Sequence, residues 1–210
     1  MTNLKTLQEA IEKGKLSDAV DAARTAVAEN AGAQSIMGAM MSAMEAIGQR
    51  FEQGKAFVPE LLMASRAMKG ALELVQPLLA ADKSALRGKV IIGTVKGDLH
   101  DIGKNLVSSM LEGSGFEIVD LGIDVPTDKF VAAVREQQPD ILCMSALLTT
   151  TMPCMREVVE AIKAAGLRDK VKIVVGGAPV SQSYSNEIGA DGYGDNANSA
   201  AVLAKSLMAA

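Results

Sequence analysis

Hydrophobic residues in the first 80 positions recur every three or four residues, which is the spacing of an amphipathic helix. The pattern restarts after Gly14, Gly32 and Gly54, and glycine is typical of helix ends. Pro59 suits the first turn of the last long stretch, where a missing amide hydrogen costs nothing. We therefore predict four helices in a small bundle, with a core that contains Ala19, Ala23, Val27, Ile36, Met40, Met44, Ile47, Phe51, Leu61, Met68, Leu72 and Val75.

After residue 88 the pattern changes to short runs of β-branched residues that alternate with helical stretches. Strands are expected at residues 90–95, 116–121, 141–145, 171–175 and 191–194. Nearly continuous apolar strands that alternate with helices indicate a parallel sheet covered on both faces. The helices are expected to begin at Ile102, Thr127, Pro153, Ser181 and Ala197.

The fold class is therefore α/β: a four-helix bundle at residues 1–85, followed at residues 88–210 by a flavodoxin-like or Rossmann-like domain with five parallel strands. The polar segment at residues 81–88 lacks periodicity and is interpreted as a connector that would permit relative motion. The length of 210 residues suits two compact domains.

Three groups of candidate site residues follow strands of the predicted sheet. His100 follows the first strand, Ser145 ends the third, and Gly176 and Gly177 follow the fourth. In a parallel α/β sheet, ligands bind beyond the carboxyl ends of the strands. The predicted topology therefore brings these residues to one edge.

His100 is the only histidine of the chain, and Asp98 and Asp101 lie close to it in sequence. Imidazole binds a transition metal through one ring nitrogen, and a carboxylate such as Asp98 can accept the N–H of the other. Gly103 leaves room for a large planar group near the backbone. A lone histidine at a surface or a helix cap is the ordinary alternative.

The cysteines, Cys143 and Cys154, are neither at CxxC spacing nor close to His100 in sequence, and they are interpreted as small buried hydrophobic residues. Zinc sites usually need three or four protein ligands. If His100 binds a metal, we therefore expect a macrocyclic cofactor to supply the other ligands. The sequence around the first strand does not spell G-x-G-x-x-G, which disfavours a nicotinamide enzyme.

The pattern Asp98-x-His100-x-x-Gly103 resembles the signature of cobalamin-binding domains of the methionine synthase type. Ser145-Ala146-Leu147 resembles the Ser-x-Leu loop of that family, and Gly176-Gly177 resembles its Gly-Gly loop. The stretch at residues 57–64 is similar to the helical cap domain of corrinoid proteins in methyltransferase systems. The resemblance thus extends over almost the entire chain.

The resemblance implies that His100 replaces the nucleotide base as the lower axial ligand of cobalt, with Asp98 as its hydrogen-bond partner. It implies that Ser145 touches the displaced base, and that Thr151, in place of the usual serine, extends the Asp–His chain, whereas simple capping of the strand end is the alternative for both hydroxyls. Gly176 and Gly177 would let the backbone approach the nucleotide tail, whereas an ordinary turn is the alternative. The implied cofactor-binding set is Asp98, His100, Asp101, Ile102, Gly103, Ser145, Leu147, Thr149, Thr151, Gly176 and Gly177.

The function implied is that of a corrinoid methyl carrier that is not an enzyme by itself. A donor-specific methyltransferase would load a methyl group onto Co(I), and a pterin- or thiol-dependent methyltransferase would remove it; a corrinoid-reactivating reductase is a further expected partner. The alternatives are a cobalamin-dependent sensor, an isomerase subunit and, if the cobalamin inference fails, a flavodoxin-like binding module.

Composition supports a cytoplasmic protein without nucleic-acid or membrane partners. The formal net charge is −4, which provides no basic surface for nucleic acid. The sequence contains no signal-peptide pattern and no apolar run of the length that spans a membrane. The methionines Met37, Met40, Met41, Met44, Met63 and Met68 are expected mainly in the core, although such side chains can also cover a corrin ring.

Overall fold

The computed structural model describes residues 2–81 and 86–209, which pack as two compact units. One unit contains residues 1–87 together with Glu112–Gly115. The other contains Gly88–Leu111 and Phe116–Ala210. Among the described residues, none of the helices has both the length and the apolar character needed to cross a membrane.

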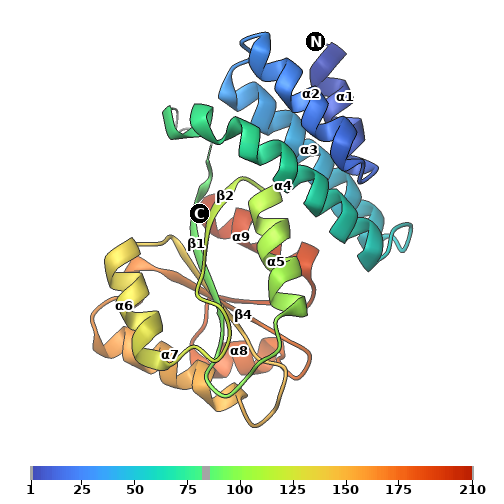
Figure 1. The fold of residues 1–210 in the computed structure, drawn as a ribbon. Coiled ribbons are helices and arrows are strands. Elements are labelled where there is room, and N and C mark those ends of the chain that lie inside the picture. Colours follow the sequence, from blue (N-terminus) through green and yellow to red (C-terminus); the bar gives the residue numbers. More distant parts are fainter. Residues whose placement is uncertain (1, 82–85, 210) are drawn as a thin grey trace. The chain divides into compact units, whose positions relative to one another are not determined.

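The first unit contains the four predicted helices, α1 (Thr2–Glu12), α2 (Leu16–Ala28), α3 (Ala33–Glu52) and α4 (Val58–Ala81) (Figure 1). Helix α2 packs against α1 and α4, and α3 packs against α1 and α4. The predicted core residues are buried, except that Val27 and Phe51 are half-buried. Helix α4 continues to Ala81, so the expected connector begins later, and residues 82–85 lie outside the described part of the chain.

The second unit contains five parallel strands in the order β2-β1-β3-β4-β5. The prediction of a five-stranded parallel α/β sheet is therefore confirmed. The strands are β1 (Gly88–Thr94), β2 (Phe116–Asp120), β3 (Ile141–Ser145), β4 (Lys172–Gly176) and β5 (Gly192–Gly194). The helices are α5 (Ile102–Gly113), α6 (Thr127–Gln137), α7 (Met152–Ala164), α8 (Gln182–Ile188) and α9 (Ala197–Ala209), and a short 3₁₀ helix lies at Arg168–Lys170.

Helices α6, α7 and α8 lie on one face of the sheet, and α5 and α9 lie on the other (Figure 1). Burial on both faces explains why the strand sequences are apolar without alternation. Residues of β1, β3 and β4 pack with α6 and α7 in one core, which includes Ile91, Phe130, Leu142, Met155, Val158 and Ile173. Most strand and helix ends differ from the predicted ones by one or two residues, as at α7, which begins at Met152.

The strand order places a topological switch point between β1 and β3. From β1 the chain passes through α5 to β2 on one side, whereas from β3 it passes through α7 to β4 on the other. In parallel α/β sheets, ligands bind beyond the carboxyl ends of the strands at such a point. The candidate residues His100 and Ser145 follow these two strands.

Candidate functional site at the carboxyl edge of the sheet

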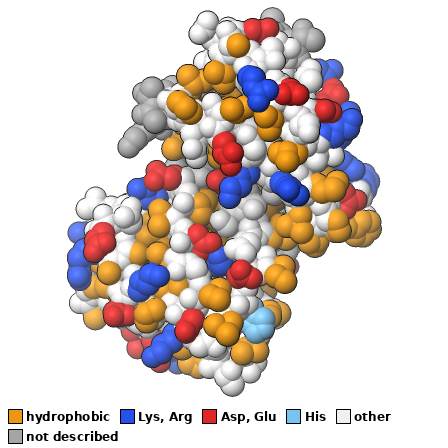
Figure 2. All heavy atoms as spheres, in the orientation of Figure 1, with side chains coloured by type: hydrophobic (Ala, Val, Ile, Leu, Met, Phe, Trp, Pro, Cys, Tyr) orange, Lys and Arg blue, Asp and Glu red, His pale blue; other side chains and the backbone are white. Residues whose placement is uncertain are grey.

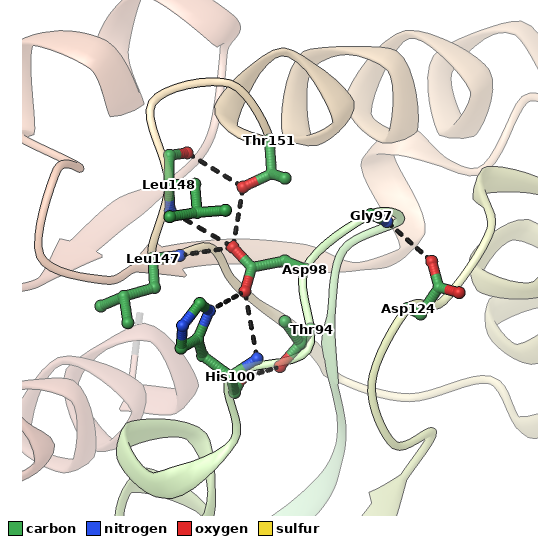
Figure 3. Close-up of polar contacts among 8 residues, drawn as sticks. All are labelled: Thr94, Gly97, Asp98, His100, Asp124, Leu147, Leu148 and Thr151. Carbon is green, nitrogen blue, oxygen red and sulfur yellow. Dashed lines mark hydrogen bonds and ion pairs between the residues drawn. The ribbon is translucent and has the colours of Figure 1, made fainter.

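Asp98 lies at the centre of a polar cluster that joins the loops after β1 and β3 (Figure 3). Its Oδ1 accepts hydrogen bonds from the backbone N–H of His100 at 3.1 Å and from Nδ1 of the same ring at 2.6 Å. Its Oδ2 accepts hydrogen bonds from the backbone N–H groups of Leu147 at 2.7 Å and Leu148 at 3.3 Å, and from the Thr151 hydroxyl at 2.7 Å. The carboxylate thus holds the two loops together.

Three backbone N–H groups and the Thr151 hydroxyl donate to Asp98, which favours its ionised form, and an ionised carboxylate can only accept a hydrogen bond from Nδ1 of His100. Burial alone would raise the pKa of Asp98. The hydrogen bonds from Leu147, Thr151 and His100 outweigh this effect and hold its pKa well below the usual range. A buried negative charge is therefore fixed beside the imidazole ring.

His100 presents its second ring nitrogen at the surface. Because Nδ1 donates to Asp98, the neutral ring has its lone pair on Nε2, which has no hydrogen-bond partner among the described residues. The side chain is 50% exposed. The backbone is also fixed, since the buried Thr94 hydroxyl donates to the His100 carbonyl at 2.9 Å. The arrangement leaves one ring nitrogen of His100 available to a ligand.

The surface around His100 is apolar. Figure 2 shows the single histidine, in pale blue, beside hydrophobic side chains. Leu99 is 66% exposed, Ile102 81%, and Leu147 and Leu148 are each 42% exposed. A Cβ placed on Gly103 would meet nothing within 4 Å. These residues fit a large, largely apolar macrocycle that lies over His100, because such a ligand would cover them and use the open space at Gly103.

The other polar residues predicted for the site differ in their surroundings. Ser145 is half-buried at the end of β3, in the same loop as Leu147 and Thr151. Asp101 accepts a hydrogen bond from the Asn105 side chain at 3.0 Å and lies just before α5. Thr149 is exposed, and its side chain makes no hydrogen bond to any described residue. The geometry therefore joins Thr151 directly to the Asp98–His100 pair but does not join Thr149 to it.

Gly176 and Gly177 have a reason to be glycine within the protein itself. Gly177 has φ of 128°, and a Cβ there would lie 1.8 Å from the carbonyl oxygen of Ala146. A Cβ on Gly176 would lie 2.9 Å from the carbonyl oxygen of Gly194. Close packing of adjacent strand ends therefore requires both glycines, whether or not a nucleotide tail also approaches them.

The methionines and cysteines mostly contribute to packing. Met37, Met40, Met44 and Met68 are buried in the helical unit, whereas Met63 is 49% exposed. Burial raises the pKa of the Cys143 thiol to about 12. The expectation that Cys154 is buried is wrong: it is half-buried, because it lies in the first turn of α7, where the helix emerges from the sheet edge.

Sequence reasoning missed residues that contact the His100 loop from β2 and the segment after it. Asp124 accepts a hydrogen bond from the backbone N–H of Gly97 at 2.7 Å. Lys104, which is only 3% exposed, forms an ion pair with Asp120. The predicted topology could have indicated these residues, because the segment after β2 reaches the same carboxyl edge of the sheet as the loops after β1 and β3.

No group of three or more His, Cys, Asp or Glu within residues 2–81 and 86–209 is placed to hold a metal ion.

Comparisons with known proteins match both units of the chain. Residues 88–202 and residues 4–76 each match a family model described as a B12 binding domain. Dimethylamine corrinoid protein 3 of Methanosarcina mazei is 46% identical over 79% of this chain and 100% of that protein. Trimethylamine corrinoid protein 2 of the same organism is 47% identical over 79% of this chain and 77% of that protein.

A solved structure is similar over nearly the whole chain. The methanol:cobalamin methyltransferase complex MtaBC from Methanosarcina barkeri contains a chain with a TM-score of 0.86 and 29% identity. The match covers 99% of this chain and 80% of that one. The family matches together span both units. This chain therefore belongs to the B12-binding family and binds a cobalamin-type cofactor.

Proposed function

We propose that this chain is a corrinoid methyl carrier, with a helical domain at residues 1–85 and a cobalamin-binding domain at residues 88–210, that is not an enzyme by itself. The observation that carries the proposal is the His100 imidazole, whose Nδ1 is held by the buried Asp98 carboxylate and whose Nε2 is open at an apolar surface. When bound, cobalamin supplies a cobalt centre that, as Co(I), accepts a methyl group and later gives it up.

In this proposal each residue has a defined task. His100 would hold the cofactor by offering its Nε2 lone pair to the cobalt. Asp98 keeps the Nδ1 proton and the ring orientation unchanged, because its four other hydrogen bonds hold the carboxylate in place. Thr151 has one hydroxyl proton, which it can donate to Asp98 or to the Leu148 carbonyl. The side chains of Ile102 and Leu147 would exclude water from the ligated nitrogen.

The remaining site residues would bind the displaced nucleotide tail and the edge of the ring. Asp101 and Gly103 lie at the start of α5 on the His100 side, and Ser145, Thr149, Gly176 and Gly177 follow β3 and β4 at the same edge. A tail placed there would stay away from Nε2. The carboxyl edge would then hold the cofactor in the form in which its own base does not compete with His100 for cobalt.

The partners would be a donor-specific methyltransferase, a pterin- or thiol-dependent methyltransferase and a corrinoid-reactivating reductase. We propose a methylated amine as the donor class, because two of the relatives are named for dimethylamine and trimethylamine. Their identities of 46% and 47% do not distinguish between these two amines. The methanol-linked structure has the lower identity of 29%.

The proposal is tested by adding hydroxocobalamin to the purified protein and recording its absorption spectrum. We expect a base-off, histidine-on spectrum. Electron paramagnetic resonance of the Co(II) state should show splitting by an axial nitrogen. The His100→Ala variant should bind the corrinoid more weakly and lose this splitting. An axial-nitrogen signal that is unchanged in His100→Ala would refute His100 as the ligand.

The carrier role needs a separate experiment with methyltransferases. The reduced holoprotein is mixed with a purified methylamine-specific methyltransferase and its amine, and with a methanol-specific methyltransferase and methanol. We expect a change in the cobalt spectrum with the amine-specific methyltransferase and its amine, and no change with the methanol system or without a methyltransferase. A spectral change with the amine alone would contradict the proposal that the chain is inert without its partners.

A further inference from the structure

The segment at residues 120–125, which begins at the end of β2, contacts the His100 loop through Asp124. The Asp124 carboxylate accepts a hydrogen bond from the Gly97 backbone N–H at 2.7 Å (Figure 3). The backbone N–H of the same residue donates to the Asp98 carbonyl at 3.0 Å. Asp124 therefore binds two successive residues of the loop, one of which carries the carboxylate that orients His100.

Asp124 adopts a backbone conformation that is uncommon for a residue with a side chain. Its φ is 50°, in the left-handed region, which aspartate and asparagine tolerate better than most residues. In this conformation both its backbone N–H and its carboxylate contact the Gly97–Asp98 segment. Left-handed residues persist where the surrounding contacts favour them, and these two contacts supply such a reason.

The same segment has a second attachment on the other side of His100. Asp120 forms an ion pair with Lys104, which lies in the first turn of α5 and is 3% exposed. The other oxygen of Asp120 accepts a hydrogen bond from the Gly122 backbone N–H at 2.8 Å. A lysine is almost never this buried unless it is paired. The ion pair thus attaches α5, directly after the His100 loop, to the segment that contains Asp124.

Backbone hydrogen bonds fix this segment to the end of β1. The Thr94 N–H donates to the Gly122 carbonyl at 3.0 Å, and the Val125 N–H donates to the Thr94 carbonyl at 3.0 Å. Thr94 is also the residue whose hydroxyl donates to the His100 carbonyl. The segment at residues 120–125 therefore contacts the chain before and after His100, and it is connected to His100 itself only through Thr94.

We propose that residues 120–125 act as a brace that holds the His100 loop in the geometry for cobalt ligation, with Asp124 as its main positioning residue and the Lys104–Asp120 ion pair as its second anchor. The inference rests on the proposed role of His100 as the cobalt ligand. A ligand held in place before the metal arrives binds more tightly, because less conformational freedom is lost on ligation. Asp124 itself touches neither cobalt nor corrin in this proposal.

The first test uses the cofactor-free protein. Asp124→Gly keeps the left-handed conformation accessible and removes the acceptor for Gly97, whereas Asp124→Asn keeps an oxygen that can still accept that hydrogen bond. We expect amide hydrogen exchange at Gly97 to become at least about threefold faster in Asp124→Gly and to change little in Asp124→Asn. The signal of His100, the only histidine in the chain, should shift in the nuclear magnetic resonance spectrum of the glycine variant.

A matched control is Gln138→Gly. Gln138 also has a left-handed backbone, with φ of 46°, but it ends α6 rather than contacting the His100 loop. This variant should leave both the Gly97 exchange rate and the His100 signal unchanged. Unchanged Gly97 exchange in Asp124→Gly would overturn the brace, and so would an equal change in Gln138→Gly.

The second test is a double-mutant cycle on hydroxocobalamin affinity. Asp124→Gly should raise the Kd by about 3- to 10-fold, the effect of losing one hydrogen bond. In the His100→Ala background the same substitution should change the Kd less than twofold, because the brace acts through the histidine. An equal effect in both backgrounds would assign Asp124 a merely structural role. If His100→Ala itself leaves the Kd and the axial-nitrogen signal unchanged, the proposed ligation fails, while the exchange experiment still decides whether the brace exists.

Lys104→Met provides an independent variant, because methionine has a similar volume and leaves no unpaired buried charge. We expect it to raise the Kd for hydroxocobalamin in the wild-type background but not in His100→Ala. If Asp124→Gly fails to fold, Lys104→Met still tests the proposal. If Lys104→Met raises the Kd equally in the His100→Ala background, the Lys104–Asp120 ion pair does not act through His100 and is not part of the brace.

Discussion

The helical unit and the α/β unit both expose large apolar side chains, but they fix them in different ways. At the start of α4, Phe57 is 64% exposed, and its backbone N–H donates to the Glu60 side chain at 3.1 Å, three residues away. Around His100 the hydrogen bonds of Asp98 reach Leu147 and Thr151, which are 49 and 53 residues away in sequence. The apolar surface at Phe57 is therefore fixed by a contact between near neighbours in sequence, whereas the surface around His100 is fixed by contacts between strands of the sheet.

Because one surface depends on local contacts and the other on long-range contacts, the two should differ in how they tolerate substitution. The apolar residues at the start of α4 require only that a helix begins there, so a substitution should leave the folding of the unit nearly intact. The His100 surface requires that β1 and β3 be neighbours and that their loops meet at Asp98. Substitutions should therefore lower the free energy of unfolding strongly at the carboxyl edge of the sheet and only slightly at the start of α4.

The largest contrast is expected between two glycine-to-alanine substitutions. Gly177→Ala should destabilise the α/β unit by about 4 kcal/mol or more, since φ is 128° and the added Cβ would lie 1.8 Å from the Ala146 oxygen. Gly38→Ala, within α3 and with nothing within 4 Å of its Cβ, should stabilise the helical unit by about 0.5–1 kcal/mol. Urea unfolding of the cofactor-free proteins measures both changes in the free energy of unfolding. If both substitutions destabilise the protein, or both stabilise it, the contrast is contradicted.

Asp98→Ala should follow in size, with a loss of about 2–4 kcal/mol in the free energy of unfolding. The substitution leaves the partly buried donors of Leu147, Thr151 and His100 without their acceptor. Asp21→Ala is the matched control on α2, where Asp21 forms an exposed ion pair with Arg24, and it should cost less than about 1 kcal/mol. A similar loss in both variants would show that the long-range contacts of Asp98 add little.

The stability of the cofactor-free protein should depend on pH through Asp98. Because the pKa of Asp98 is lower in the folded protein than in the unfolded chain, the unfolded state binds the proton first as pH falls. The stabilisation from Asp98 is complete above about pH 4–5 and declines below that, by up to about 1.4 kcal/mol per pH unit. Asp98→Asn should reduce this slope in the cofactor-free protein. A slope that is unchanged in Asp98→Asn would contradict the assignment.

Thr151 should show a smaller, graded effect. Thr151→Ser keeps the hydroxyl that donates to Asp98, so the expected loss is less than about 1 kcal/mol. Thr151→Val keeps the shape and removes the donor, and should cost about 1–2 kcal/mol. Thermal unfolding of the two variants provides the comparison. A serine variant that is less stable than the valine variant would indicate that the methyl group matters more than the hydrogen bond.

Phe57→Ala should have the smallest effect on folding. Its side chain is 64% exposed, so the free energy of unfolding of the cofactor-free protein should change by no more than about 0.5 kcal/mol. The axial-nitrogen signal of the Co(II) state should also be unchanged, because His100 belongs to the other unit. A destabilisation of about 2 kcal/mol would mean that this apolar surface is part of the core, and the comparison between the two units would fail.

Sequence alone determined the features that depend on neighbours along the chain. Periodicity predicted the four helices and the strands, because burial selects apolar residues at the spacing of each element. The pattern of Asp98, His100 and Gly103 indicated the ligand loop, because an Asp two residues before a His can contact its ring. The exact ends of the helices and strands were predicted less accurately, since the first and last turns of helices depend on contacts made elsewhere.

Tertiary structure decided which distant residues complete the site. The strand order places the β3 loop beside the β1 loop, so that the Leu147 and Leu148 amides reach Asp98. It also brings Asp124 and the Asp120–Lys104 pair to the His100 loop, which no local spacing predicts. The conflict between Gly177 and Ala146 likewise exists only after β3 and β4 pair. These contacts depend on sheet register, which the chain establishes only when it folds.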